Sequence, residues 1–257
     1  MSRSRGGSQA SERSQSGRGL AAVVALLALG GGGGCADNES SLFIRHVQVP
    51  DEASCITEPD PEGTFFTSGF IDAAFRSEYS ASLLIGNQVV GRGDTDQLRT
   101  ETSKIKIYEY DVRILNADGA VLDGGEYTAP TAGFIDQKEG ETESYGLAGA
   151  ILVDANTAGA LGSAAGGSGF TQEVVSEVIV RGRTLGGNEL ESGPFTFPIS
   201  VCFGCALFFP PGVNDGLNAC GGEGEGEITT TCLPGQDSLV DCRLCRASNP
   251  ALCNPAL

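Results

Sequence analysis

The sequence contains no tryptophan, a single methionine at its start, and one histidine, His46. His46 is therefore the only side chain that could act as the base of a Ser-His-Asp or Cys-His arrangement. A metal site with several histidine ligands is excluded. A lone histidine on a strand is typically a surface or half-buried residue, and we expect this of His46. The lack of tryptophan, with aromatic residues at 7%, also weakens the case for sugar binding.

Positive charge and long apolar runs are scarce as well. The chain has 16 lysines and arginines against 33 aspartates and glutamates, which gives a net charge of −17. This acidity argues against nucleic acid or anionic lipid headgroups as partners, because both need basic residues to displace counterions. No stretch after the first 35 residues approaches 18 consecutive apolar residues, so we expect no membrane-spanning helix there. Phosphate-binding glycine motifs are also lacking, and we expect no cofactor.

Residues 1–34 have the pattern of a signal peptide. Four arginines and one glutamate precede the ten-residue apolar run Leu20–Leu29, which is followed by Gly30–Gly34 and Cys35. A basic region, a short apolar region and a small-residue exit are typical of such leaders. As a helix, ten residues rise only about 15 Å, which is half the thickness of the hydrocarbon core. Cleavage before Cys35 leaves 223 residues and lowers the net charge to −20, because the leader carries three net positive charges.

The end of this leader resembles the signal of bacterial lipoproteins, in which a small residue precedes a cysteine that is acylated before cleavage. Gly33, Gly34 and Cys35 match the last three places, whereas Gly32 stands where an aliphatic residue is usual. The resemblance implies a lipid anchor on Cys35, a tether over residues 35–41 and attachment to the cell envelope, and Ala36 implies the outer membrane. The alternative is ordinary cleavage near Gly30, which would give a secreted protein with a free thiol.

The number of cysteines fits the lipid anchor. Nine cysteines are odd for an oxidising compartment, and acylation of Cys35 would leave eight, enough for four disulfides. We predict that these eight form disulfides of unknown pairing: Cys55, Cys202, Cys205, Cys220, Cys232, Cys242, Cys245 and Cys253. Seven of them lie after residue 201, so complete pairing requires one bridge from this tail to Cys55. The chain as a whole resembles the cysteine-rich lipoproteins of Gram-negative bacteria, a likeness that implies compartment and anchoring but no activity.

The 38 glycines and the alternating apolar residues predict a mainly β protein. The clearest strand spans residues 103–115, where Tyr108, Tyr110, Val112 and Ile114 would share an apolar face. We predict an antiparallel β-sandwich, Ig-like or similar, over residues 42–201, followed by a small disulfide-stapled module over residues 202–257; a barrel is the alternative. Other expected segments are strands at 42–50, 79–90 and 145–153, a loop at 159–169, a hairpin of 174–185 with 195–201, and an edge position for the strand containing Pro194 and Pro198.

Two Cys-x-x-Cys pairs suggest metal or redox chemistry as alternatives to structural disulfides. Cys202 with Cys205 and Cys242 with Cys245 could together hold zinc, but 36 residues separate the pairs and three other cysteines would be idle. A thioredoxin-like site needs its first cysteine at a helix N-terminus, and the two prolines after residue 209 limit any helix there. Export also favours oxidation, and structural disulfides remain the prediction.

Several acidic stretches could bind cations or act as acid pairs. Asp94 with Asp96, and Glu223, Glu225 and Glu227, offer oxygen ligands for calcium but lack the order of an EF-hand loop, so solvated loops are expected. The tripeptide of residues 92–94 spells an integrin motif, which chance explains in a glycine-rich chain.

These observations predict a non-catalytic binding or structural protein of the cell envelope. Its expected partners are the membrane, through the lipid on Cys35, and an envelope protein or glycan. The first alternative is an exported hydrolase that uses two carboxylates about 5–10 Å apart in a cleft. The second alternative is an accessory subunit of an envelope complex, which would expose an apolar patch.

Overall fold

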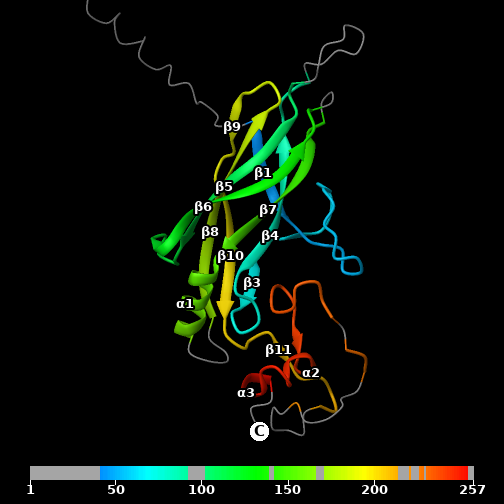
Figure 1. Ribbon diagram of the computed structural model, residues 1–257, viewed down its shortest axis with the longest axis vertical. Coiled ribbons are helices and arrows are strands. Elements are labelled where there is room, and N and C mark those ends of the chain that lie inside the picture. Colours follow the sequence, from blue (N-terminus) through cyan, green and yellow to red (C-terminus); the bar gives the residue numbers. More distant parts are fainter. Residues whose placement is uncertain are drawn as a thin grey trace, which may run out of the picture. The chain divides into compact units, whose positions relative to one another are not determined.

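The computed structural model describes residues 41–91, 102–138, 142–165, 171–213, 220, 226–228 and 230–253. Their fold is mainly β, with two sheets packed against each other and a tail rich in cysteine (Figure 1). The smaller sheet is antiparallel throughout. Its strands, in order, are β2 (Phe65–Phe66), β1 (Leu42–Gln48), β4 (Tyr79–Asn87) and β7 (Ser144–Val153).

The larger sheet contains one parallel pair among its antiparallel ones. Its strands, in order, are β3 (Gly69–Asp72), β10 (Phe195–Cys202), β8 (Thr171–Thr184), β5 (Ile105–Leu115) and β6 (Val121–Ile135), with β9 (Glu189–Glu191) pairing beside β8. The parallel pair is β3 with β10. The predicted hairpin is confirmed, since β8 pairs with both β9 and β10. The predicted edge position of the proline strand is wrong for Ile199–Cys202, which pair with β3, whereas Phe195–Pro198 pair with β8 alone.

The core lies between the two sheets and contains side chains of both. The inward residues of β5 are Ile105, Ile107, Tyr110, Val112 and Ile114, and all of them are buried. A register shift between residues 107 and 109 interrupts the alternation of this strand. The expectation that Tyr108 belongs to the apolar face is therefore wrong, and its hydroxyl donates to Glu189 on the outer face. Inward alternation on both sheets gives the sandwich that the sequence predicts.

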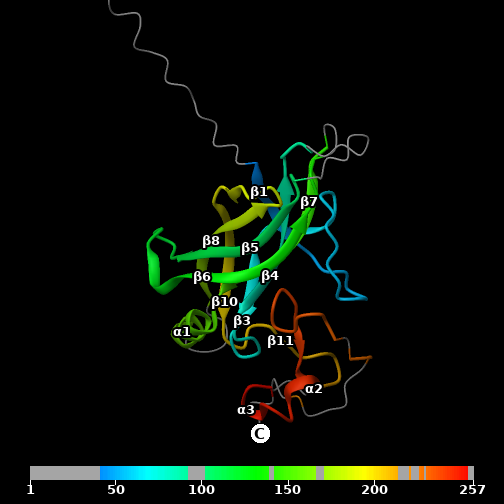
Figure 2. The same cartoon turned by 45° about the horizontal axis from the view of Figure 1, so that its top comes forward.

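Residues 159–165 of the segment predicted as a loop belong to the helix α1 (Ala155–Ala165), so that prediction is wrong for them, and residues 166–169 lie outside the described ranges. The Asp154 carboxylate accepts the N–H groups of Asn156 and Thr157 and satisfies the first turn. Figures 1 and 2 show α1 beside the ends of β8 and β10. At Gly162 an added Cβ would lie 2.5 Å from the Cβ of Ala73, so only a residue without a side chain allows this close packing.

Side chains of β6 cover the outer edge of β7, the last strand of the smaller sheet. The Thr131 hydroxyl donates to the carbonyl of Gly149, and the Tyr127 hydroxyl donates to the carbonyl of Ile151, each at 2.7 Å. Carbonyl groups on an edge strand otherwise invite pairing with another chain. The crossing of β6 over β7 therefore joins the two sheets and protects this edge.

The cysteine-rich tail packs on the sandwich, and the two belong to one compact unit, Asn38–Leu257. The tail contains the short strands β11 (Leu207–Phe208) and β12 (Val240–Asp241) and the short helices α2 (Cys242–Cys245) and α3 (Pro250–Cys253). Its small core, around Ala206 and Val240, packs against Phe70 and Phe75 of the sandwich. None of the helices within the described ranges is long and apolar enough to span a bilayer.

One disulfide connects the tail to the loop after β1, between Cys55 and Cys232, across 177 residues of sequence. We predict that the double variant Cys55→Ala/Cys232→Ala loses about 5 kcal/mol of unfolding free energy, because a bridge across a long loop restricts the unfolded chain most. Hydrogen exchange of residues 230–241 should rise as the tail loosens. Chemical denaturation and exchange mass spectrometry measure the two effects.

The matched control is Cys202→Ala/Cys205→Ala, which removes a bridge across only three residues of sequence. The same chain-entropy reasoning gives a loss of about 2 kcal/mol for this short loop. Equal losses of unfolding free energy in both double variants would contradict the prediction that Cys55–Cys232 stabilises the fold more than Cys202–Cys205 does.

Candidate functional site

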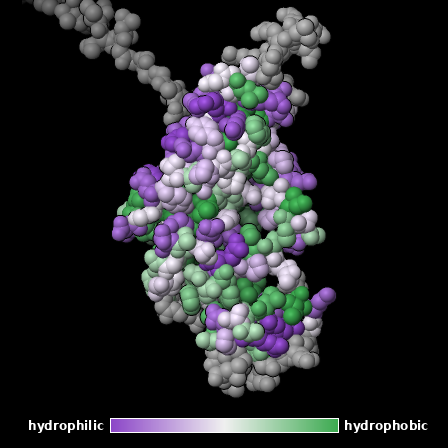
Figure 3. All heavy atoms as spheres, in the orientation of Figure 1, coloured by the Kyte–Doolittle hydropathy of each residue, from purple (hydrophilic) through white to green (hydrophobic). Residues whose placement is uncertain are grey.

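A groove of about 300 Å³ lies at the seam between the sandwich and the tail. The half-buried side chains of Val49, Pro50, Phe66 and Leu233 contribute apolar walls. In the space-filling view, apolar surface also gathers over the lower part of the molecule, where the tail lies (Figure 3). The groove therefore exists only because the tail is docked beside β1 and β2.

Asp237 supplies a carboxylate at this seam. One of its oxygens accepts the N–H of Phe70 at 2.7 Å, and the other accepts the hydroxyl of Tyr79 at 2.7 Å. Asp237 has a φ of 53°, in the left-handed region, which the sharp turn of the tail requires. Burial raises the pKa of Asp237 above its usual range, although the two hydrogen bonds oppose this shift. Burial, with the nearby Asp237 charge, also raises the pKa of Tyr79 well above its usual value.

Gln236 fixes the tail to β4 through its side-chain amide. Its Oε1 accepts the N–H of Ser80 at 3.1 Å, and its Nε2 donates to the carbonyl of the same residue at 2.6 Å. A side-chain amide with this two-point contact replaces the partner strand that β4 lacks at this end. The groove floor is thus held by hydrogen bonds on both sides of the turn.

His46 takes part in packing. Its ring contacts Phe65 and Gln48, and neither of these is an acid or a nucleophile. Its side chain is only 6% exposed, so the expectation of a surface or half-buried residue is wrong. The ring stacks on Phe65, with centroids 4.7 Å apart, and its Nε2 lies 2.8 Å from Oε1 of Gln48. Gln48 in turn donates to the carbonyl of Thr64. These contacts give His46 a structural role between β1 and β2.

Four disulfides join the eight cysteines predicted to pair. The pairs are Cys55–Cys232, Cys202–Cys205, Cys220–Cys242 and Cys245–Cys253. The two Cys-x-x-Cys segments do not converge on one point, because the cysteines of the second segment have different partners. A zinc site of four thiolates from these segments is therefore not formed. Cys35, the predicted lipidation site, lies outside the described residues, as do the leader and most of the tether.

The loop between Cys202 and Cys205 surrounds the carboxylate of Asp72. Asp72 is fully buried and accepts the N–H groups of Gly204 at 2.7 Å, Ala206 at 2.8 Å and Ala74 at 3.0 Å. A carboxylate oxygen and the two sulfurs lie within 4.8 Å of one another. Among the described residues this is the one group of three acid, cysteine or histidine side chains close enough for a shared metal ion. With the sulfurs joined as a disulfide, they offer no thiolate ligands.

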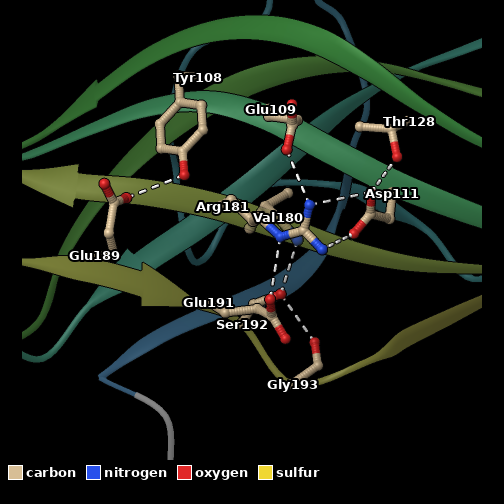
Figure 4. A network of polar contacts seen from close by, with 10 residues as sticks. All are labelled: Tyr108, Glu109, Asp111, Thr128, Val180, Arg181, Glu189, Glu191, Ser192 and Gly193. Carbon is tan, nitrogen blue, oxygen red and sulfur yellow. Dashed lines mark hydrogen bonds and ion pairs between the residues drawn. The ribbon is translucent and has the colours of Figure 1, made fainter.

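Acidic side chains also gather on the outer face of the larger sheet, where Arg181 binds them together (Figure 4). Arg181 forms ion pairs with Glu109 at 2.9 Å, with Glu191 at 3.1 Å and with Asp111. The hydrogen bonds that Arg181 donates to Glu109 and Glu191 raise its pKa above the usual range. Three carboxylates share this one guanidinium on the sheet face, so the cluster keeps negative charge while its ion pairs connect neighbouring strands.

The remaining acidic stretches lie mostly outside the described residues. This holds for Asp94 and Asp96, for Glu223 and Glu225, and for the tripeptide of residues 92–94. Glu227 is described and is exposed.

The important polar residues of the seam were not predicted from the sequence. Asp72, Gln236 and Asp237 bind groups 132 to 167 positions away along the chain, except for the contact of Asp72 with Ala74. The only local signal is a polar residue at the end of an apolar strand, for Asp72, and a glycine-containing turn before residues 236 and 237. Such signals indicate turns and do not identify partners.

No protein-family model, curated protein or solved structure matches the chain. Among the described residues, we take the groove at the seam and the loop of Cys202–Cys205 as candidate sites.

The raised pKa of Asp237 predicts a pH-dependent stability. A carboxyl group with a raised pKa in the folded state stabilises the fold fully below its ordinary pKa of 3.8, and this contribution is lost as the pH rises through the folded value. We expect Asp237→Asn, which cannot ionise, to gain stability relative to the original protein as the pH rises above 3.8. Urea denaturation over a pH series measures this difference.

A second variant is Tyr79→Phe, which removes the hydroxyl bound to Asp237 but keeps the titrating carboxylate. Because this hydrogen bond lowers the pKa of Asp237, its loss should raise that pKa further and strengthen the pH dependence of stability. A constant stability difference for Asp237→Asn across the series would show that the carboxyl group is not perturbed by the fold.

Proposed function

We propose that the chain is an exported protein anchored to the cell envelope by lipid on Cys35, with a non-catalytic binding or structural role at the membrane surface. The observation that carries this proposal is the complete pairing of the other eight cysteines in four disulfides. This pairing uses every cysteine within the described residues and supports lipidation of Cys35, which lies outside them. Disulfides of this number are typical of oxidising compartments and support export.

The groove at the seam is the proposed binding surface. Its volume of about 300 Å³ is at the lower end for small-molecule sites and suits a single side chain of a partner. The apolar walls from Val49, Pro50, Phe66 and Leu233 favour an aromatic or aliphatic side chain inserted as an anchor. A protein partner is therefore proposed in preference to a glycan.

The accessory-subunit alternative is compatible with this partner class. Large apolar side chains of the tail are exposed, among them Phe208, Leu239 and Leu244. Such groups on one part of a surface are typical of contacts with other proteins. The hydrolase alternative has less support, because Arg181 holds the carboxylates that come together on the larger sheet.

Intact-mass spectrometry of the protein purified from membranes tests the anchor. We expect a chain that lacks residues 1–34, carries acyl groups at Cys35 and gains eight hydrogens on reduction, two for each disulfide. Cys35→Ala should abolish the acyl mass and move the protein out of the detergent phase. The control Ser41→Ala should keep the acyl mass and stay in the detergent phase. An unacylated species, or free thiols beyond one, would refute the anchor.

Titration with indole, as a mimic of an inserted aromatic side chain, tests the groove. Amide chemical shifts of Leu233, Gln236 and Ser238 should move on addition of indole, because these residues line the groove. Leu233→Glu places a charge in the apolar wall and should weaken binding at least about tenfold. The matched control is Leu239→Glu, since Leu239 is 56% exposed and lies outside the groove. Equal binding by both variants would exclude this groove as the site.

A further inference from the structure

The loop of Cys202–Cys205 differs from the other disulfides in what holds its shape. The β10 ladder ends at Cys202, whose carbonyl accepts the N–H of Ala73 at 2.8 Å. From within the loop, Asp72 accepts the N–H groups of Gly204 and Ala206. These hydrogen bonds fix the backbone on both sides of the bridge without involving either sulfur. The backbone contacts that place the two sulfurs together therefore do not require the S–S bond.

The two residues of this bridge also differ in their exposure to solvent. Cys202 is only 1% exposed, whereas Cys205 is an exposed residue of the loop. Gly204 beside it has a φ of 77°, in the left-handed region, which turns the chain so that Cys205 can return to Cys202. A thiolate from outside would therefore approach the bridge from the side of Cys205.

The bridge spans only three positions of sequence, so it restricts the unfolded chain least among the four. The next shortest, Cys245–Cys253, has both cysteines buried. Cys55 is exposed as well, but its bridge connects the tail to the sandwich across 177 positions. Among the four disulfides, only Cys202–Cys205 combines a short sequence span with one exposed cysteine and one buried cysteine. Its loop is also held by backbone hydrogen bonds that do not involve the sulfurs. Such a disulfide is suited to chemistry more than to stability.

We propose that Cys202–Cys205 is a thiol–disulfide exchange site for a protein dithiol, with Cys205 as the sulfur attacked and Asp72 as a positioning residue. A partner thiolate forms a bond to the Cys205 sulfur, and the Cys202–Cys205 bond breaks with its electron pair on Cys202. The Cys202 sulfur takes up the proton that the partner thiol released.

The second partner thiol then attacks the partner sulfur of this mixed disulfide. Cys205 leaves with the electron pair and takes up the second proton. The protein gains two thiols, while the partner dithiol is oxidised to a disulfide, and the reverse sequence oxidises the protein. This activity is independent of the proposed groove and of the lipid anchor.

A redox titration with defined ratios of reduced to oxidised dithiothreitol tests the proposal on the full mature protein. Thiols are blocked with N-ethylmaleimide at each ratio and located by peptide mass spectrometry. Cys202–Cys205 should be half reduced at a ratio at least about tenfold lower than the other three bridges. Cys245–Cys253 is the control for short span with buried sulfurs. If Cys202–Cys205 is reduced together with it or later, the proposal is refuted.

Trapping identifies the sulfur that is attacked. Reduced thioredoxin without its resolving cysteine serves as the protein probe, since it stops at the mixed disulfide. We expect the adduct on Cys205, with little on Cys55, which controls for exposure alone. An adduct mainly on Cys55, or none, overturns the assignment.

Asp72→Asn tests the positioning role through the rate at which the ring closes again. In this variant an NH₂ group replaces one of the oxygens that accept the N–H groups of Gly204 and Ala206. Because two donors then face each other, the loop should be held less well and reoxidation of Cys202–Cys205 should slow by about tenfold. The matched control is Asp51→Asn, because Asp51 also accepts backbone N–H groups, near Cys55, from Ala53 and Ser54. An unchanged closing rate rejects the role of Asp72. If Asp72→Asn does not fold, the trapping result on the original protein decides the exchange site.

Discussion

Two carboxylates that accept backbone N–H groups at the junction of sandwich and tail hold this structure together. Asp72 takes the N–H groups of the loop that starts the tail, and Asp237 takes that of Phe70 and the hydroxyl of Tyr79. Buried donors without an acceptor cost about 1–3 kcal/mol each. Removal of Asp72 would leave unpaired N–H groups on both sides of the junction, whereas removal of Asp237 would leave the Phe70 N–H and the Tyr79 hydroxyl unpaired on the sandwich. The apolar contacts of the tail with Phe70 and Phe75 add to these hydrogen bonds.

Both candidate sites depend on this junction through the short strand β3. Asp237 contacts the strand at Phe70, beside the groove, and Asp72 ends it, inside the loop of Cys202–Cys205. Because β3 pairs in parallel with β10, the same ladder places Cys202 opposite Asp72. A strand of four residues thus positions a binding groove on one side and a disulfide loop on the other.

Local patterns in the sequence predicted the strands well and their partners poorly. The alternation in residues 105–115 identified β5, but the bulge after Ile107 placed Tyr108 on the outer face. Helix α1 was missed because its alanines and glycines carry no apolar stripe, although Asp154 is a recognisable cap. The odd number of cysteines in the tail indicated a bridge from the tail to Cys55. The choice of Cys232 as the partner depends on docking contacts between distant residues. The groove and the Asp72 loop arise from those same contacts and have no local signature.

The span of the Cys55–Cys232 bridge also fixes an order of events during synthesis. The ribosome makes Cys55 177 residues before its partner, so this thiol must wait while most of the sandwich is made. The next cysteines to emerge are Cys202 and Cys205, which are close enough to pair with each other and leave Cys55 untouched. Since β10 ends at Cys202, every strand of both large sheets is present before the staple can close. Cys242, Cys245 and Cys253 follow Cys232, so the bridges Cys220–Cys242 and Cys245–Cys253 await later synthesis. Cys55–Cys232 can therefore already join the tail to a sandwich whose strands have all been made.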